Sequence, residues 1–87
     1  MANNMEQKWT IGQLARRVNM RTSALRYYEE MGLLPHPERS ESGYRLYDSS
    51  AEQALRFIQR MQQLGFSLAD IQIFLENWRN GNLKNDA

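Results

Sequence analysis

The 87-residue sequence contains no cysteine and only one histidine. The lack of cysteine excludes disulfides, thiolate metal sites and cysteine nucleophiles. The single histidine, His36, lies between Pro35 and Pro37, and no second imidazole exists to complete a metal site or a catalytic pair. Glu29 and Glu30 are adjacent, so on a helix they diverge by about 100° and cannot share a substrate. We therefore predict no enzymatic activity, no cofactor and no bound metal.

Long apolar runs and an excess of charge of one sign are also absent. No run approaches the roughly 20 residues needed to cross a bilayer, and the first residues lack the charged and apolar regions of a signal peptide. This composition predicts a cytoplasmic protein without membrane contacts. The formal charge is +1, from 11 Lys+Arg against 10 Asp+Glu, so total charge alone does not indicate a nucleic-acid partner.

The distribution of the charges is more informative than their total. Residues 16–26 contain four arginines and no acid. This stretch leads into a basic, aromatic segment, which we predict to be a helix over about 22–31. Thr22 or Ser23 would cap its start and Gly32 would end it. Leu25 and Tyr28 share one face of this helix, and the other faces carry the charges. Such a surface suits a groove lined by phosphates and base edges.

The residues before this helix predict a partner helix. Ile11, Leu14, Ala15 and Val18 have the spacing of one apolar face, and Thr10 with Gln13 has the spacing of a capping box. A short turn would join the two helices into a helix-turn-helix. Residues 1–8 are polar and aperiodic, and we interpret them as a flexible arm.

The residues after Gly32 predict a change of structure. Pro35 and Pro37 exclude a helix, and alternating residues on either side of the Ser42-Gly43 turn predict a small β-hairpin, or wing, over about 39–47. Two more helices follow. One starts at a second capping-box spacing, Ser49 to Glu52, and ends at Gly65.

The last helix would start at Ser67 with Asp70 in its first turn. It carries Leu75 and Trp78 on its apolar side, and Asn80-Gly81 would end it. Residues 80–87 would be a flexible tail. The predicted fold class is therefore mainly α: a winged helix-turn-helix of about four helices with a small hairpin, forming one domain over residues 9–79.

Four motifs in this order resemble the MerR family of transcription regulators. They are Thr10-Ile-Gly-Gln-Leu-Ala15, Thr22-Ser-Ala-Leu-Arg-Tyr-Tyr-Glu-Glu-Met-Gly-Leu-Leu-Pro35, Gly43-Tyr-Arg-Leu-Tyr47 and Leu64-Gly-Phe-Ser-Leu-Ala-Asp-Ile71. The resemblance covers about residues 9 to 78. It implies sequence-specific binding of double-stranded DNA, with the second helix in the major groove and the wing on the flanking backbone.

The motifs and the basic stretch together give a set of candidate DNA-binding residues. They are Arg16, Arg17, Arg21, Thr22, Ser23, Arg26, Tyr27, Tyr28, Ser42, Gly43, Tyr44 and Arg45. Some have structural interpretations as well. Core packing is favoured for Tyr28, packing of the hairpin is an equal alternative for Tyr44 and Tyr47, and complementation of the helix dipole is the alternative for Arg16 and Arg17.

Several alternatives remain open at the level of sequence. Full-length relatives implied by the resemblance carry a dimerisation helix and a sensor, so this chain is either a truncated DNA-binding domain or a minimal regulator. Its partners would be promoter DNA, RNA polymerase through promoter distortion, and a second copy as a homodimer or head-to-tail oligomer. An excisionase-like or small-developmental-regulator-like architectural protein on direct repeats, and a protein-interaction module without DNA binding, are the competing functions.

Overall fold

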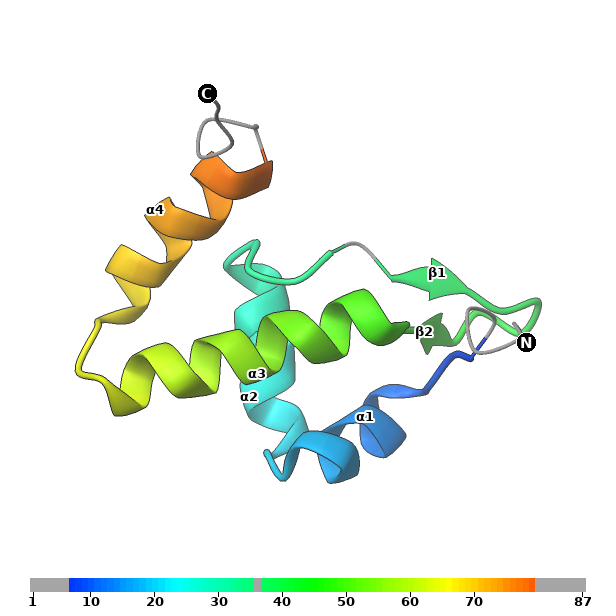
Figure 1. Ribbon diagram of the computed structural model, residues 1–87. Helices are drawn as coiled ribbons and strands as arrows, with labels where there is room; N and C mark the ends of the chain where they lie inside the picture. The colour runs from blue at the N-terminus through cyan, green and yellow to red at the C-terminus, as the bar shows by residue number, and fades with distance from the viewer. Residues whose placement is uncertain (1–6, 36, 80–87) are drawn as a thin grey trace.

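The computed structural model describes residues 7–35 and 37–79 (Figure 1). His36, most of the predicted N-terminal arm and all of the predicted tail, with the Asn80-Gly81 helix end, lie outside the described residues. The elements in chain order are α1 (Ile11–Val18), α2 (Thr22–Glu30), β1 (Glu38–Arg39), β2 (Arg45–Leu46), α3 (Ser49–Gln63) and α4 (Leu68–Arg79). Four helices and one two-stranded antiparallel hairpin confirm the predicted winged helix-turn-helix.

The first helix starts as its sequence predicts. The Thr10 hydroxyl accepts from the Gln13 backbone N–H, and the Gln13 side chain accepts from the Thr10 N–H, which completes the capping box. Asn19 ends the helix in the left-handed region with φ 59°, a conformation that asparagine tolerates better than most residues. The tight turn that follows lets α2 start three residues later.

The N-cap of α2 differs from the prediction, whereas the start of the helix at Thr22 and its end agree with it. Arg21 is the N-cap residue in an extended conformation, and no side chain caps the helix. Thr22 is already helical, so the predicted cap by Thr22 or Ser23 was wrong. At the other end Gly32 has φ +79°, and the Leu33 N–H donates to the Tyr28 carbonyl. Only glycine adopts this conformation without strain, so Gly32 ends α2 as predicted.

The hairpin is short and held by its own polar groups. Glu38 pairs with Leu46 and Arg39 pairs with Arg45. The Ser40 hydroxyl accepts from the backbone N–H groups of Ser42 and Tyr44, and Gly43 turns the chain at φ +90°. Beyond the hairpin, Trp9 and Tyr47 exchange two backbone hydrogen bonds of 2.8 Å. This bridge fastens the segment before α1 to the segment after β2.

The last two helices start with polar caps. Asp48, not the predicted Ser49, caps α3, because its carboxylate accepts from the Ser50 N–H while Ser49 is already helical. Gly65 follows the end of α3 with φ +99°. Before α4, Ser67 and Asp70 accept from each other's backbone N–H groups, as their spacing predicts.

One hydrophobic core joins all four helices. Its buried residues are Leu14, Ala15, Val18, Leu25, Tyr28, Leu33, Leu34, Tyr47, Ala51, Leu55, Ile58, Ile71 and Leu75. The helix α3 runs through the middle of the molecule, with the hairpin at its first end and α4 at its last (Figure 1). No helix in the described part of the chain is long and apolar enough to cross a membrane.

The later helices also satisfy the carbonyls that end the earlier ones. Arg56 and Gln59 of α3 donate to the carbonyls of Arg17 and Val18, at 3.1 Å and 2.9 Å, at the end of α1. From α4, Gln72 donates to the Met31 carbonyl at 2.7 Å.

Arg79 also reaches the end of α2 and donates to the Gly32 and Leu33 carbonyls at 2.6 Å and 2.7 Å. The final carbonyls of a helix have no partner within that helix. Side chains of α3 supply these partners at the end of α1, whereas α4 fixes the turn Met31 to Leu33 that follows α2.

Candidate nucleic-acid interface

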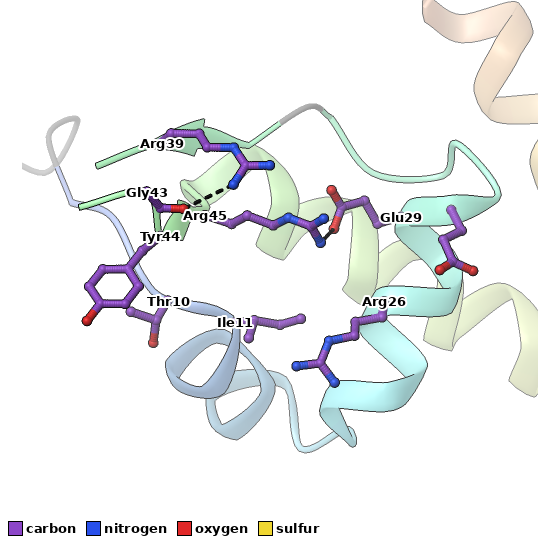
Figure 2. A pocket seen from close by; sticks show the side chains of 9 residues that line it. Thr10, Ile11, Arg26, Glu29, Arg39, Gly43, Tyr44 and Arg45 are labelled. Carbon is purple, nitrogen blue, oxygen red and sulfur yellow. Dashed lines mark hydrogen bonds and ion pairs between the residues drawn. The ribbon is translucent and has the colours of Figure 1, made fainter. Parts of the chain in front are cut away.

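A cavity of about 560 Å³ opens between the start of α1, the side of α2 and the hairpin (Figure 2). We call it the α2–hairpin notch. The residues that line it are Thr10, Ile11, Arg26, Glu29, Glu30, Arg39, Gly43, Tyr44 and Arg45. Three arginines face two glutamates, so the charged side chains of the notch carry one excess positive charge. A site of this size and charge suits an anionic backbone better than an apolar ligand.

The hairpin arginines are fixed in two different ways. Arg39 Nη1 donates to the Gly43 carbonyl at 3.0 Å, which holds its guanidinium along the hairpin. Arg45 Nη1 lies 3.1 Å from Glu29 Oε1, in an ion pair between β2 and α2. Figure 2 shows both contacts, with Arg26 extending into the same space from α2. Arginines from both sides of the notch therefore converge on its opening.

The hydroxyl of Tyr47 completes the contact between α2 and the hairpin. It donates to Glu29 Oε1 at 2.8 Å, and the tyrosine itself is buried. Burial raises the pKa of Tyr47, and the neighbouring Glu29 carboxylate raises it further. The phenol therefore stays protonated, and remains a donor, across the physiological range.

Two neighbouring tyrosines of α2 have different environments. Tyr27 is 52% exposed, beside the exposed Arg26. Tyr28 is buried, and its hydroxyl donates to Gln62 of α3 at 3.5 Å. This confirms the predicted packing of Tyr28 in the core. The outward positions available to a partner on this part of α2 are therefore Arg26 and Tyr27.

The start of α2 presents polar groups of another kind. Arg21 and Ser23 are exposed and Thr22 is half-buried. Since no side chain caps this helix, the backbone N–H groups of Thr22 and Ser23 keep their donor capacity for an outside acceptor, whereas the Ala24 N–H already donates to the Arg21 carbonyl. Anions bind favourably at such a helix end.

The two arginines at the end of α1 are not equivalent. Arg16 is exposed, and it makes no ion pair within the described residues. Arg17 contacts Glu52 of α3 through two hydrogen bonds of 3.1 Å and 3.3 Å, and its guanidinium lies 4.3 Å from the centre of the Trp9 ring. Arg17 therefore links α1 to α3, a structural role that its sequence position did not indicate.

The tip of the hairpin is open to solvent. Ser42, Gly43 and Tyr44 are all exposed, and Tyr44 lies with its ring away from the notch in Figure 2. The hairpin therefore presents these residues as an edge beside the notch.

Sequence reasoning missed two contributors to the notch. Arg39 was not among the candidates, although a strand register that pairs it with Arg45 places both arginines on one hairpin. Glu29 was considered only as half of a carboxylate pair, and its contact with Arg45 is tertiary. Within residues 7–35 and 37–79, no group of three or more His, Cys, Asp and Glu side chains is placed to hold a metal.

Comparison with known proteins places this geometry in a family context. The family model described as "MerR HTH family regulatory protein" matches residues 9–78 of this chain. The chain is 47% identical over 68 residues to the mercuric resistance operon regulatory protein of Bacillus cereus, covering 78% of this chain and 52% of the relative. It is 42% identical over 67 residues to the transcriptional regulator ZntR of Escherichia coli K12, covering 77% of this chain and 48% of ZntR.

Solved structures agree with the sequence comparison. HiNmlR, a MerR family regulator lacking the sensor domain and bound to promoter DNA, superposes with a TM-score of 0.79 at 32% identity over 86% of this chain and 57% of its own. PbrR691 from Ralstonia metallidurans CH34, in complex with lead(II), gives 0.77 at 36% identity over 88% and 59%. The chain spans about half the length of the curated relatives it matches.

Proposed function

The chain belongs to the MerR family of helix-turn-helix regulatory proteins, and on that premise we propose that it binds double-stranded DNA in a sequence-specific manner to regulate transcription. The observation that carries this proposal is the α2–hairpin notch, which Arg26 of α2 lines together with Arg39 and Arg45 of the hairpin. A relative with the same fold is bound to promoter DNA. Relatives named as regulators favour this function over an enzyme or an architectural protein.

The second helix is the element that enters the major groove. Arg26 and Tyr27 project from its exposed side, and Arg21, Thr22 and Ser23 lie at its uncapped start. A guanidinium matches the acceptor pair of guanine in that groove, and exposed hydroxyls reach either bases or phosphates. Direct reading of bases therefore rests on Arg26 and Tyr27, and the start of α2 contributes contacts to the backbone.

The hairpin holds the flanking DNA backbone. Ser42 and Gly43 allow a close approach at the tip, and Tyr44 and Arg45 supply a hydroxyl and a guanidinium. Arg39 joins this set from the facing strand. Arg16 is free to contact a phosphate near the end of α1, whereas Arg17 would have to leave Glu52 to do so. Tyr28 supports the interface from the core.

Family membership also supports a proposal for where the protein acts, how its copies assemble on DNA and how it affects RNA polymerase. The protein acts in the cytoplasm on the nucleoid, where its DNA lies. Two copies on two half-sites bind more tightly than one, because a single winged module makes few contacts. Distortion of a promoter then lets RNA polymerase engage it. Since phosphate contacts dominate for one module, binding weakens steeply as salt rises.

Selection from a random duplex library followed by footprinting tests the proposal. We expect a recovered sequence motif and a protected site. The Arg26→Ala, Tyr27→Ala double variant should lose preference for that site by about 10-fold or more, because each base contact is worth about 1–3 kcal/mol. Arg60→Ala is the matched control, since Arg60 lies near the end of α3 away from the hairpin.

Two outcomes would contradict the proposal. Recovery of no motif, with no protection of any duplex at low salt, would exclude DNA binding by this chain. DNA binding and site preference that survive the double variant unchanged would contradict the assignment of base reading to Arg26 and Tyr27.

A further inference from the structure

Glu29 carries a negative charge at a position where a negative charge is unfavourable. It lies in the last turn of α2, next to the negative end of the helix dipole. It also lines the α2–hairpin notch, where an anion repels the phosphates of DNA. Neither the stability of the helix nor charge attraction to DNA accounts for an acid here, so its contacts must supply the reason.

The side chain of Glu29 contacts residues on the hairpin side of the notch. One oxygen, Glu29 Oε1, accepts from Arg45 Nη1 at 3.1 Å and from the Tyr47 hydroxyl at 2.8 Å. The carboxylate is only 18% exposed, whereas the Arg45 side chain is 44% exposed. Glu29 is thus fixed by a buried donor, and it holds an arginine that still faces solvent.

We propose that Glu29 is a positioning residue that fixes the Arg45 guanidinium over the DNA backbone before DNA binds. This inference rests on the proposed function. Arginine has five N–H donors in a rigid fork, and the contact with Glu29 occupies the Nη1 group. The remaining donors stay available for a phosphate. Arginine is otherwise a flexible side chain, and ordering it in advance lowers the entropy lost on binding.

The same contact fixes the hairpin relative to α2. Tyr47 follows β2 and forms the backbone bridge to Trp9, so its hydroxyl holds Glu29 from a rigid part of the molecule. The distance between the helix that reads bases and the arginine that holds the backbone is therefore set by Glu29. An error in this spacing would weaken binding to every sequence.

Glu30 provides a matched control for Glu29. It is the next residue, it lines the same notch and it carries the same charge. Glu30 is exposed, and its side chain makes no hydrogen bond or ion pair within the described residues. If the acids act only through their charge, replacing either one should strengthen DNA binding. If Glu29 positions Arg45, the two replacements should have opposite effects.

The test compares Glu29→Met with Glu30→Met, because methionine keeps the length and the helix propensity of glutamate. The probe is a mixed-sequence duplex titrated at several salt concentrations and followed by fluorescence anisotropy. We expect Glu29→Met to weaken binding about three- to tenfold and to make the salt dependence shallower by about one phosphate contact. Glu30→Met should bind as tightly as the unaltered chain or more tightly.

Two further variants separate positioning from a merely structural role. Glu29→Gln keeps the acceptor oxygen without the charge, and it should restore most of the binding. In an Arg45→Ala background, Glu29→Met should no longer weaken binding and should instead leave it unchanged or strengthen it, because the carboxylate then only repels phosphates. A loss of affinity that persists in that background would overturn the inference.

A measurement on the free protein distinguishes this inference from the proposed function. The heteronuclear NOE of the Arg45 Nε–Hε group should report an ordered guanidinium in the unaltered chain and a mobile one in Glu29→Met. An unchanged NOE, or equal strengthening of binding by Glu29→Met and Glu30→Met, would overturn the inference alone. Absence of DNA binding by the unaltered chain at low salt would overturn the proposed function and this inference with it.

Discussion

The α2–hairpin notch and the outer side of α3 and α4 expose different kinds of side chain. In the notch, Arg45 and Glu29 form an ion pair, and Arg39 donates to a backbone carbonyl. The other surface, which we call the α3–α4 apolar face, exposes Leu64, Phe66, Ile73, Phe74 and Trp78. In Figure 1 the hairpin lies at the first end of α3, and α4 starts beyond its last end.

The difference shows how one small core serves two kinds of contact. Arg39, Arg45 and Glu29 of the notch are fixed by directional hydrogen bonds, which suit an ordered array of phosphates. On the α3–α4 apolar face, Phe57, Phe74 and Trp78 contact one another with ring centres 5.4–6.2 Å apart. Exposed apolar groups of this kind are held by packing and lack a directional requirement. The two surfaces should therefore be separable by mutation, except through the core beneath both.

The largest effect should come from the core that both surfaces share. Leu55 is fully buried in α3. We expect Leu55→Ala to lower the free energy of unfolding by about 2–5 kcal/mol and to weaken both surfaces together. Chemical denaturation followed by circular dichroism measures this loss. Leu64→Ala, at the exposed C-cap of the same helix, should change stability by less than about 0.5 kcal/mol. Equal effects of the two variants would contradict a shared core.

A smaller effect should separate the two surfaces. Phe74→Ala removes the stacked contact with Phe57 and the edge contact with Trp78. We expect the free energy of unfolding to fall by about 1–2 kcal/mol, and affinity for a mixed-sequence duplex to stay unchanged. Ile73→Ala, a neighbouring exposed position, is the control for loss of apolar area. A large loss of DNA affinity in folded Phe74→Ala would show that the surfaces are coupled.

The smallest effect should appear with pH. Burial alone would raise the pKa of Glu52, but hydrogen bonds from Arg56 and Arg17 outweigh it and hold the pKa below the ordinary 4.5. The folded chain thus binds this proton less tightly than the unfolded chain. The resulting stability is fully present above pH 4.5 and is lost as the pH falls through the folded value.

The contribution of Glu52 to the free energy of unfolding should be about 1 kcal/mol or less, because both of its arginine partners are about half exposed. Denaturation of the unaltered chain and of Glu52→Gln between pH 7 and pH 3 isolates it. Asp48 also has a lowered pKa, first through the Ser50 hydroxyl, and it acts in the same direction in both proteins. A constant difference between the two proteins across this range would contradict the assignment.

The helices and the hairpin were predictable because their signals are local. Apolar spacing places Leu14, Val18, Leu25 and Ile58 in the core, and glycines mark the ends of α2 and α3. The N-caps of α2 and α3 were predicted one or two residues late, although α2 itself starts at Thr22 as predicted. In each case the residue before the hydroxyl, Arg21 or Asp48, takes the extended conformation of the cap. Sequence alone does not show which of two adjacent residues does so.

The candidate interface was predictable as a set of exposed residues but not as a set of contacts. Arg26 and Tyr27 follow from helical spacing, and Arg45 from the hairpin. Glu29 and Arg45 are 16 residues apart, and Arg17 and Glu52 are 35 apart. No local pattern connects such residues, because only the packing of separate elements brings them together. Which arginines are held by acids, and which are free, therefore required the structure.

The hydrogen bonds from α4 to the end of α2 have a consequence for biosynthesis. Gln72 and Arg79 donate hydrogen bonds to the carbonyls of Met31, Gly32 and Leu33, which lie 41 to 47 residues earlier in the chain. During translation, the helix assigned to the major groove emerges from the ribosome long before these donors do. The turn that follows this helix gains these hydrogen bonds only when α4 has been released and has docked. A nascent chain that stops before Arg79 would leave the Gly32 and Leu33 carbonyls without these donors.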